Sequence, residues 1–178
     1  MALDKLFSPY TLRGVTIPNR IVSTGHDTVM AHQGQVTDRL IAYHEARAKG
    51  GAGLIIVQVA GVHETARYTS HMLMADDDTC IAGYRKLADA LHAHGTTLFA
   101  QLFHPGREIM ETDDGTGAIA YAPSAVPNSR FRVMPIPLSL DMISDIIDGF
   151  VDVLRNSNRL DFHDRSSSRS LTMLHSSS

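Results

Sequence analysis

Cysteine occurs only once in this 178-residue chain, at Cys80, and tryptophan is absent. A single cysteine excludes an intrachain disulfide and is compatible with a reducing compartment. The amino terminus lacks the basic stretch followed by an apolar stretch that marks a secretory leader. No apolar run approaches the roughly 18 residues that a membrane span needs. These absences predict a cytoplasmic protein with no membrane partner.

Net charge is also small, at -3. A chain so close to neutrality has no electrostatic reason to bind nucleic acid or an anionic membrane surface. The Gly-x-Gly-x-x-Gly and Walker patterns that hold nucleotide phosphates follow none of the expected strands. Hydrophobic residues make up 43% of the chain and charged residues 20%, which is ordinary for one globular domain with its own core.

The sequence predicts no metal site. Asp76, Asp77 and Asp78 lack the regular spacing and the terminal glutamate of a calcium loop. A solvated loop before a helix N-terminus explains these aspartates better. His92 and His94 lie two positions apart on an expected helix, so they point to different faces.

The chain does contain a regular alternation of strands and helices. Apolar segments without polar alternation predict buried strands, and apolar residues at helical spacing predict helices. The expected strands cover residues 20–23, 53–59 and 97–102, and the expected helices cover residues 38–49, 80–93 and 141–153. We expect Thr37 to cap the first helix, and Gly50 and Gly51 to end it. This alternation predicts a parallel sheet with crossover helices.

Three segments fall outside the alternation. Turn residues around Arg13 and Gly14 predict a small hairpin before the first strand. A glycine- and proline-rich loop is expected over residues 104–138, and loops of this length are usually functional or disordered. Residues 155–178 are rich in serine and arginine, and they are expected to form a disordered tail after a domain of residues 1–154.

Gln101 marks the most informative segment, where an apolar run ends in an amide and then breaks into a His-Pro-Gly-Arg turn. This pattern is typical of a buried strand whose carboxyl end opens into a binding site. An amide in an apolar run needs a hydrogen-bond partner. A planar heterocycle such as a flavin ring is one candidate, and a neighbouring backbone group is the other.

Four motifs resemble the old yellow enzyme family of flavin-dependent oxidoreductases in their order and spacing. They are Leu6–Pro9 with Gly14 and Pro18–Val22, then Gly50–Val57, Gln101–Arg107 and Ala122–Pro127. The resemblance covers residues 5–153. The first loop, with histidine at position 26, resembles the corresponding loop in the branch of the family that contains 2,4-dienoyl-CoA reductases and amine-demethylating dehydrogenases.

The resemblance implies an α/β fold of the (β/α)8 TIM-barrel type that binds FMN at the carboxyl ends of its strands. It implies hydride transfer through flavin N5, with NAD(P)H or an amine as donor and a small molecule as substrate. The residues that would contact the cofactor are Thr24, Gly25, His26, Val59, Ala60 and Gln101. His26 and Asp27 would also lie at the substrate.

The chain departs from the family in its length. Barrels of this type typically have about 250 residues, and about 200 at the least. Only three strand-helix units are recognisable here, with nothing apolar enough for a fourth strand after residue 153. The predicted fold is therefore an incomplete TIM barrel with an N-terminal hairpin and a tail, and an out-of-frame tail would explain the change in composition. The alternative function is a truncated, inactive fragment that binds no flavin alone. Such a fragment is expected to self-associate through its exposed barrel edges.

Overall fold

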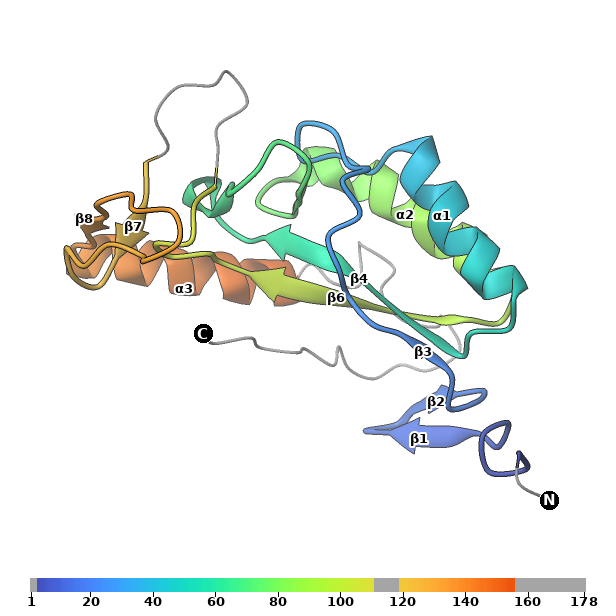
Figure 1. The fold of residues 1–178 in the computed structure, drawn as a ribbon. Helices are drawn as coiled ribbons and strands as arrows, with labels where there is room; N and C mark the ends of the chain where they lie inside the picture. The colour runs from blue at the N-terminus through green and yellow to red at the C-terminus, as the bar shows by residue number, and fades with distance from the viewer. Residues whose placement is uncertain (1–2, 111–118, 156–178) are drawn as a thin grey trace.

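The computed structural model describes residues 3–110 and 119–155, which form a parallel sheet flanked by helices (Figure 1). The sheet strands are β3 (Val22–Ser23), β4 (Leu54–Gly61), β5 (Leu73–Met74) and β6 (Thr97–Phe103), and the helices are α1 (Asp38–Lys49), α2 (Ile81–His92) and α3 (Leu140–Arg155). β4 pairs in parallel with β3, β5 and β6. The predicted alternation and parallel sheet are therefore confirmed.

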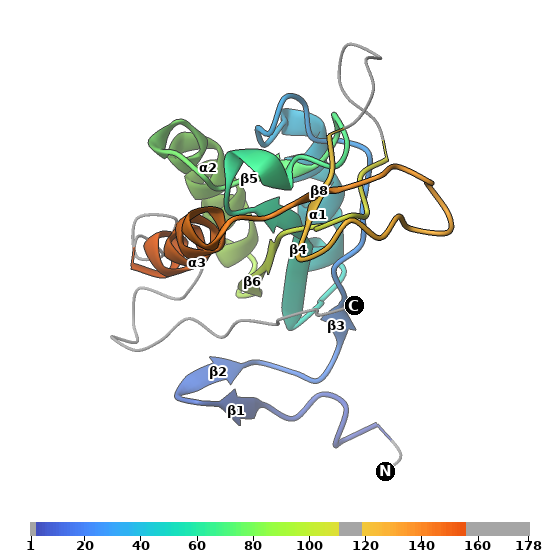
Figure 2. The same ribbon diagram turned by 90° about the vertical axis from the view of Figure 1, so that its left-hand side faces the viewer.

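Figure 2 looks toward the carboxyl ends of the strands and shows the three helices on the outer side of an arc of strands. Residues of β4 alternate between the two faces of this arc. Ile55 and Val57 pack into the outer core beneath the helices, whereas Ile56 packs on the inner face against Phe99. The register between β4 and β6 shifts after Ile56, which changes the faces of the residues that follow.

The amino-terminal hairpin covers the inner face at the opposite end of the strands. It consists of β1 (Tyr10–Leu12) and β2 (Val15–Ile17), paired antiparallel. Gly14 in its turn has a φ of 91°, a left-handed conformation that glycine adopts without steric cost. Val15 and Ile17 are buried against Leu54, Ile56 and Phe99. The predicted hairpin is confirmed.

Local signals set the ends of α1 as predicted. Thr37 has extended backbone angles, and its hydroxyl oxygen accepts a hydrogen bond from the Leu40 amide at 3.2 Å. At the other end the Gly50 amide donates to Ala46, and Gly51 follows with a φ of 91°. The helix therefore satisfies backbone groups at both termini that would otherwise lack partners.

The structure adds elements that the sequence did not predict. The expected loop of residues 104–138 contains two short parallel strands, β7 (Tyr121–Ala122) and β8 (Ile136–Pro137). The 3-10 helices η1 (Glu64–Ala66) and η2 (Asp78–Cys80) were also missed. α3 continues to Arg155, two residues beyond its expected end. The predicted tail, apart from Arg155, lies outside the described residues.

The aspartates before α2 have a structural role, as expected. Asp77 caps η2, because its carboxylate accepts a hydrogen bond from the Thr79 amide at 2.8 Å. Cys80 follows in a buried position, and burial together with Asp77 and Asp76 raises the pKa of its thiol to about 12. In the described part of the chain, no helix combines the length and apolar character needed to cross a membrane.

His44 on α1 makes the fold sensitive to acid. Its side chain is 1% exposed, and neither ring nitrogen has a hydrogen-bond partner among the described residues. Burial, followed by the charges of Arg47 and His26, lowers the pKa of His44 to about 4 from 6.5. The folded protein therefore favours the neutral ring, whereas the unfolded chain takes up a proton below pH 6.5.

We therefore expect the unfolding free energy to fall as pH drops from 6.5 toward 4, by at most about 1.4 kcal/mol per pH unit from this residue. Urea denaturation at several pH values measures the slope. In His44→Leu the slope over this window is expected to be smaller, because the titrating group is gone. Equal slopes in the two proteins would contradict this role.

Candidate functional site

Three of the predicted cofactor residues meet at the carboxyl ends of the strands. Val59 on β4 and Gln101 on β6 are register partners in the parallel sheet. Gly25 follows β3, and a Cβ added there would lie 2.7 Å from Gln101 Oε1 and 3.2 Å from the Val57 carbonyl oxygen. A side chain at position 25 would therefore displace the Gln101 amide, whereas glycine leaves it in place.

The Gln101 amide is left without a partner in the described residues. Its side chain is half-buried, and no hydrogen bond joins it to residues 3–110 or 119–155. The backbone partner considered from the sequence is therefore not found in this part of the chain. A half-buried amide at a strand end, with no internal partner, is suited to bind a polar ligand edge.

Thr24 and Ala60 lie near these residues but differ in the exposure of their side chains. Thr24 is exposed beside Gly25 at the end of β3. Ala60 is 1% exposed, and its side chain belongs to the outer core beneath the helices. Any contact from Ala60 to a ligand on the inner face would therefore come from its backbone.

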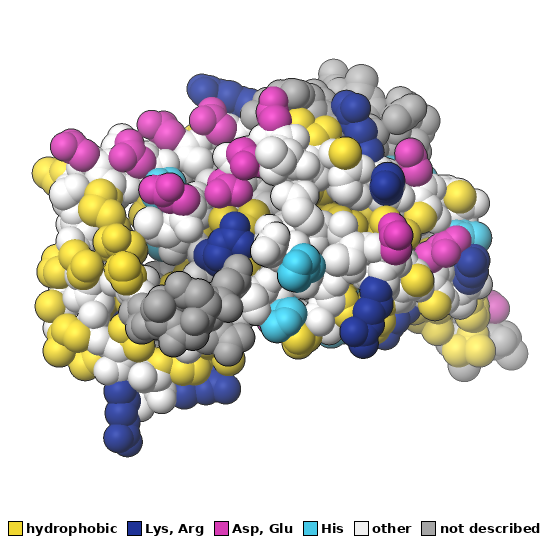
Figure 3. Space-filling view, turned by 90° about the horizontal axis from the view of Figure 1, so that it is seen from above, with side chains coloured by type: hydrophobic (Ala, Val, Ile, Leu, Met, Phe, Trp, Pro, Cys, Tyr) yellow, Lys and Arg dark blue, Asp and Glu magenta, His cyan; other side chains and the backbone are white. Residues whose placement is uncertain are grey.

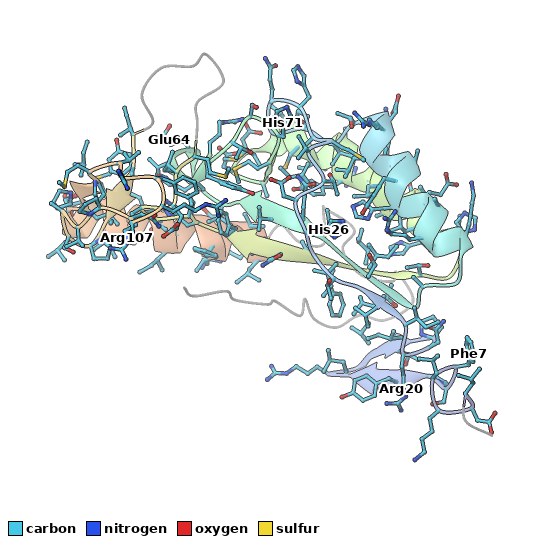
Figure 4. All side chains as sticks on the ribbon, viewed as in Figure 1. Phe7, Arg20, His26, Glu64, His71 and Arg107 are labelled. Carbon is cyan, nitrogen blue, oxygen red and sulfur yellow. The ribbon has the colours of Figure 1, made fainter. Side chains whose placement is uncertain are left out.

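His26 is turned toward α1, on the segment that leaves β3 (Figure 4). Its Nδ1 lies 3.0 Å from the Thr24 carbonyl oxygen, which can only accept, so Nδ1 carries the proton. Nε2 then accepts a hydrogen bond from the Tyr43 hydroxyl. Both ring nitrogens of His26 are thus engaged within the protein.

Asp27 is also engaged in local contacts. One carboxylate oxygen accepts a hydrogen bond from the Val29 amide at 3.1 Å, and the other accepts from the Tyr68 hydroxyl at 2.9 Å. The Tyr68 ring packs edge-on against Phe103, with centroids 5.4 Å apart. Burial, and then the bond to Asp27, raises the pKa of Tyr68 far above its ordinary value. Tyr68 therefore remains a neutral hydrogen-bond donor near the strand ends.

Gln58 is a functional-site neighbour that the sequence analysis missed. It is 1% exposed, and its Oε1 accepts from both the amide and the hydroxyl of Thr28, at 3.2 and 2.5 Å. Its Nε2 donates to the His71 carbonyl oxygen at 3.0 Å. A glutamine inside an apolar strand is the same signal that singled out Gln101. At Gln58, however, the amide binds the protein itself and holds Thr28 in the loop after β3.

A chain of hydrogen bonds links the ends of β4 and β6. The Gly106 amide donates to His104 Nδ1 at 3.1 Å, so His104 carries its proton on Nε2, which lies 2.9 Å from Thr65 Oγ1. The Thr65 amide donates to His63 Nδ1 at 3.2 Å, and the Thr65 hydroxyl donates to the same nitrogen at 2.8 Å.

Burial, and then the charge of His63, lowers the pKa of His104 to about 4. His104 is therefore neutral near pH 7, and its Nδ1 holds the turn by accepting from the Gly106 amide.

The comparisons with known proteins identify the family. The profile of the NADH:flavin oxidoreductase / NADH oxidase family matches residues 5–162. The chain belongs to this family. The NADH oxidase of Thermoanaerobacter brockii is 39% identical over 151 residues, which are 83% of this chain and 23% of the relative. The NADPH dehydrogenase of Bacillus pumilus is 32% identical over 160 residues, which are 89% of this chain and 46% of the relative.

Solved structures of other proteins show the same fold. An old yellow enzyme homologue from Zymomonas mobilis superposes with a TM-score of 0.77 at 24% identity, over 89% of this chain and 46% of that chain. Morphinone reductase in complex with tetrahydroNAD gives a TM-score of 0.76 at 25% identity, over 88% and 47% of the two chains. The predicted resemblance and the partial TIM barrel are confirmed. The chain spans a quarter to a half of the length of the relatives named here.

The family match also confirms FMN as the family's cofactor and NADH or NADPH as its electron donor. The residues on the inner face of the sheet are suited to contact part of such a cofactor. The absence of a side chain at Gly25 lets its backbone pack closely against β4 and β6, and Gln101 offers an unpartnered amide beside it. Glycine allows close backbone approach to a ligand, and a fixed donor near a flavin tunes the charge that the ring carries.

Proposed function

We propose that this chain is the FMN-binding amino-terminal part of an oxidoreductase of the old yellow enzyme type. The observation that carries the proposal is the Gln101 amide, which lies unpartnered beside Gly25 at the strand ends of a flavin-family fold. When bound, FMN supplies a hydride carrier at its N5 atom, with NADH, NADPH or an amine as donor. A cytoplasmic location remains a prediction.

Each residue of this site would make a different contact with the flavin. Gln101 would donate to the polar edge of the isoalloxazine ring, and Val59 would pack beside it as its register partner. Gly25 and Thr24 would border the ring through their backbone, as would Ala60. Fixed donors and a closely fitted surface position a reacting atom without reorganisation.

His26 and Asp27 would face a small-molecule substrate beyond the flavin. In the structure His26 is bound to Tyr43 and Asp27 to Tyr68. A substrate would therefore have to donate a hydrogen bond to His26 Nε2 in place of the Tyr43 hydroxyl. The bond from Tyr68 keeps Asp27 in one orientation, which would present the same polar surface to each substrate.

A second candidate is a truncated, catalytically inactive fragment that binds no flavin alone. This candidate rests on coverage, because the chain matches 23% of one relative named above and 46% of another and so supplies only part of the residues around a flavin in this family. The described residues offer contacts to one side of a flavin ring, so affinity is expected to be low. A titration with excess FMN is therefore the appropriate test, because a dissociation constant of 1 mM still corresponds to about -4 kcal/mol.

We expect the flavin absorbance bands to shift saturably when the chain is titrated with FMN. Gln101→Leu removes the amide and keeps the size of the side chain, so it is expected to weaken binding about tenfold, which equals one hydrogen bond of about 1.4 kcal/mol. Gln35→Leu is the matched control, because Gln35 lies in the loop before α1 and its side chain donates to Thr79. It should leave the titration unchanged.

The two candidates predict different results. A chain that is folded by circular dichroism and leaves the FMN spectrum unchanged up to about 1 mM would favour the inactive fragment. Saturable binding that is equal in the native protein and in Gln101→Leu would contradict the role given to Gln101.

A further inference from the structure

Tyr43 on α1 makes a hydrogen bond to the segment that leaves β3. Its hydroxyl donates to His26 Nε2, and Nδ1 of the same imidazole ring donates to the Thr24 carbonyl oxygen at 3.0 Å. The His26 side chain is exposed, so water is available to both ring nitrogens. Burial therefore does not require the contact with Tyr43, and the effect of the contact is to fix the orientation of the His26 ring.

The Tyr43 ring is itself held in place by its neighbours on α1. The Arg47 guanidinium lies over the ring, with Cζ 3.4 Å from the ring centroid, and its Nη1 donates to the Tyr43 carbonyl oxygen at 2.8 Å. The buried His44 ring packs edge-on against Tyr43, with centroids 5.1 Å apart. A cation over an aromatic ring is attracted to its electrons, and it strengthens the hydroxyl as a donor because donation leaves negative charge on the phenol oxygen. A fixed and polarised donor therefore faces His26.

The bond from His26 to Thr24 carries this constraint to the backbone at the proposed flavin site. The Thr24 carbonyl and the Gly25 amide belong to one planar peptide group, so fixing the carbonyl direction also fixes the direction of the amide N–H. Gly25 lies against Gln101 at the carboxyl ends of the strands. A series of contacts thus runs from α1 to a backbone group beside the Gln101 amide.

We propose that Tyr43 is a positioning residue of this site. Through His26 it fixes the peptide group between Thr24 and Gly25, and Arg47 holds Tyr43 in the orientation that this requires. The constraint lasts until a substrate donor takes the place of the Tyr43 hydroxyl. Its expected effect on FMN binding rests on the function proposed above, whereas its effect on His26 and Gly25 does not.

A basic surface that binds an anionic partner is the alternative role for Arg47. Figure 3 shows acidic and basic side chains intermixed over the end of the molecule that carries α1. On α1 itself, Glu45 pairs with Lys49 at 3.0 Å, and Asp38 lies exposed in the first turn. Arg47 is half-buried and engaged with Tyr43. The charge of Arg47 therefore acts on the tyrosine rather than as part of a basic patch.

Imidazole and amide NMR of the full chain tests the positioning role without FMN. At about pH 8.5, where an ordinary imidazole is neutral, native His26 is expected to be protonated at Nδ1 and to accept a hydrogen bond at Nε2. Its resonances are assigned from their loss in His26→Gln. Tyr43→Phe removes the hydroxyl and keeps the ring, so it is expected to shift both the His26 Nε2 resonance and the Gly25 amide resonance.

Arg47→Met keeps an unbranched side chain over the ring and removes the charge. It is expected to shift the same two resonances in the same direction but by less, and it supplies the readout if Tyr43→Phe fails to fold. Tyr10→Phe is the matched control, because Tyr10 also lies beneath an arginine, with Arg20 Cζ 5.1 Å from its ring centroid, but on the hairpin. The control should leave both resonances unchanged. A folded Tyr43→Phe protein with native His26 and Gly25 resonances would overturn the proposal.

The FMN titration separates this role from the proposed function. Where the native chain binds FMN, Tyr43→Phe is expected to weaken binding about fivefold, less than the loss of the direct donor in Gln101→Leu. Equal FMN affinity in Tyr43→Phe and the native chain would overturn the proposal. A native chain that does not bind FMN would overturn the proposed function, and the His26 and Gly25 resonances would then decide the positioning role alone.

Discussion

Replacing Gly25 with valine is expected to reduce FMN affinity at least about 100-fold, the equivalent of about 2.7 kcal/mol. A Cβ at this position would meet Gln101 Oε1 at 2.7 Å and the Val57 carbonyl oxygen at 3.2 Å. The closest atom is the end of a flexible side chain, so the protein can accommodate the change by moving the Gln101 amide. The variant therefore displaces the donor, and its two methyl groups extend from a position that Gln101, Val57 and Ile56 already crowd.

The FMN absorbance titration described above measures this effect, and thermal unfolding monitors the fold. Gly50→Ala is the matched control, because Gly50 has an ordinary φ of -74° and its nearest contact for a new Cβ is 3.4 Å. The control should bind FMN as the native chain does. Unchanged FMN affinity in Gly25→Val would show that the ligand does not lie against this backbone.

Replacing Gly149 with alanine is expected to lower the unfolding free energy by about 2 kcal/mol, within the range for overpacked positions. Helix propensity alone predicts the opposite sign, since alanine is favoured over glycine inside a helix by about 1 kcal/mol. In the structure a Cβ at Gly149 would clash with the Val62 carbonyl oxygen and would lie 3.3 Å from its carbon. These are backbone atoms of the segment after β4, which cannot rotate away.

The clash would push α3 off the sheet and would expose Val153, which is 4% exposed in the native fold. Chemical denaturation gives the unfolding free energy directly. Ser144→Ala on the exposed side of the same helix is the control, and it should be neutral or slightly stabilising because it changes propensity without a contact. A stabilised Gly149→Ala protein would mean that α3 does not pack against Val62.

The regular elements of the fold were predictable because their causes are local. The N-cap at Thr37 and the glycines at 50 and 51 are short-range signals, and the structure uses them as expected. β7 and β8 were missed because each is two residues long. A strand of that length carries no periodic pattern, and it forms only because a distant segment pairs with it.

The faces of the site residues were harder to predict than their positions. Simple alternation from Ile56, which packs on the inner face, would place Ala60 on that face as well. The register shift between Ile56 and Val59 changes the alternation, so Val59 lies beside Gln101 and Ala60 faces the helices. A bulge of this kind depends on pairing between two strands, so the sequence of one strand does not predict it.

Side-chain partners far apart in sequence were also beyond prediction. His26 bonds to Tyr43, which lies seventeen positions away on α1. Gln58 and Gln101 have the same residue type within similar apolar strands, yet one is fully bonded inside the protein and the other is not. Tertiary contacts alone separate a structural amide from one that is available to a ligand.

Side-chain amide NMR tests the central claim most directly, because it observes Gln101 itself. The resonances of Gln101 are assigned from their loss in Gln101→Leu, and those of Gln58 serve as an internal reference bonded within the protein. On addition of FMN, the Gln101 amide signals are expected to shift saturably while the Gln58 signals stay in place. A flavin site at the ends of β3, β4 and β6 would be contradicted if the Gln101 signals do not shift while FMN binds. It would also be contradicted if the chain is folded and its spectrum does not change on addition of FMN.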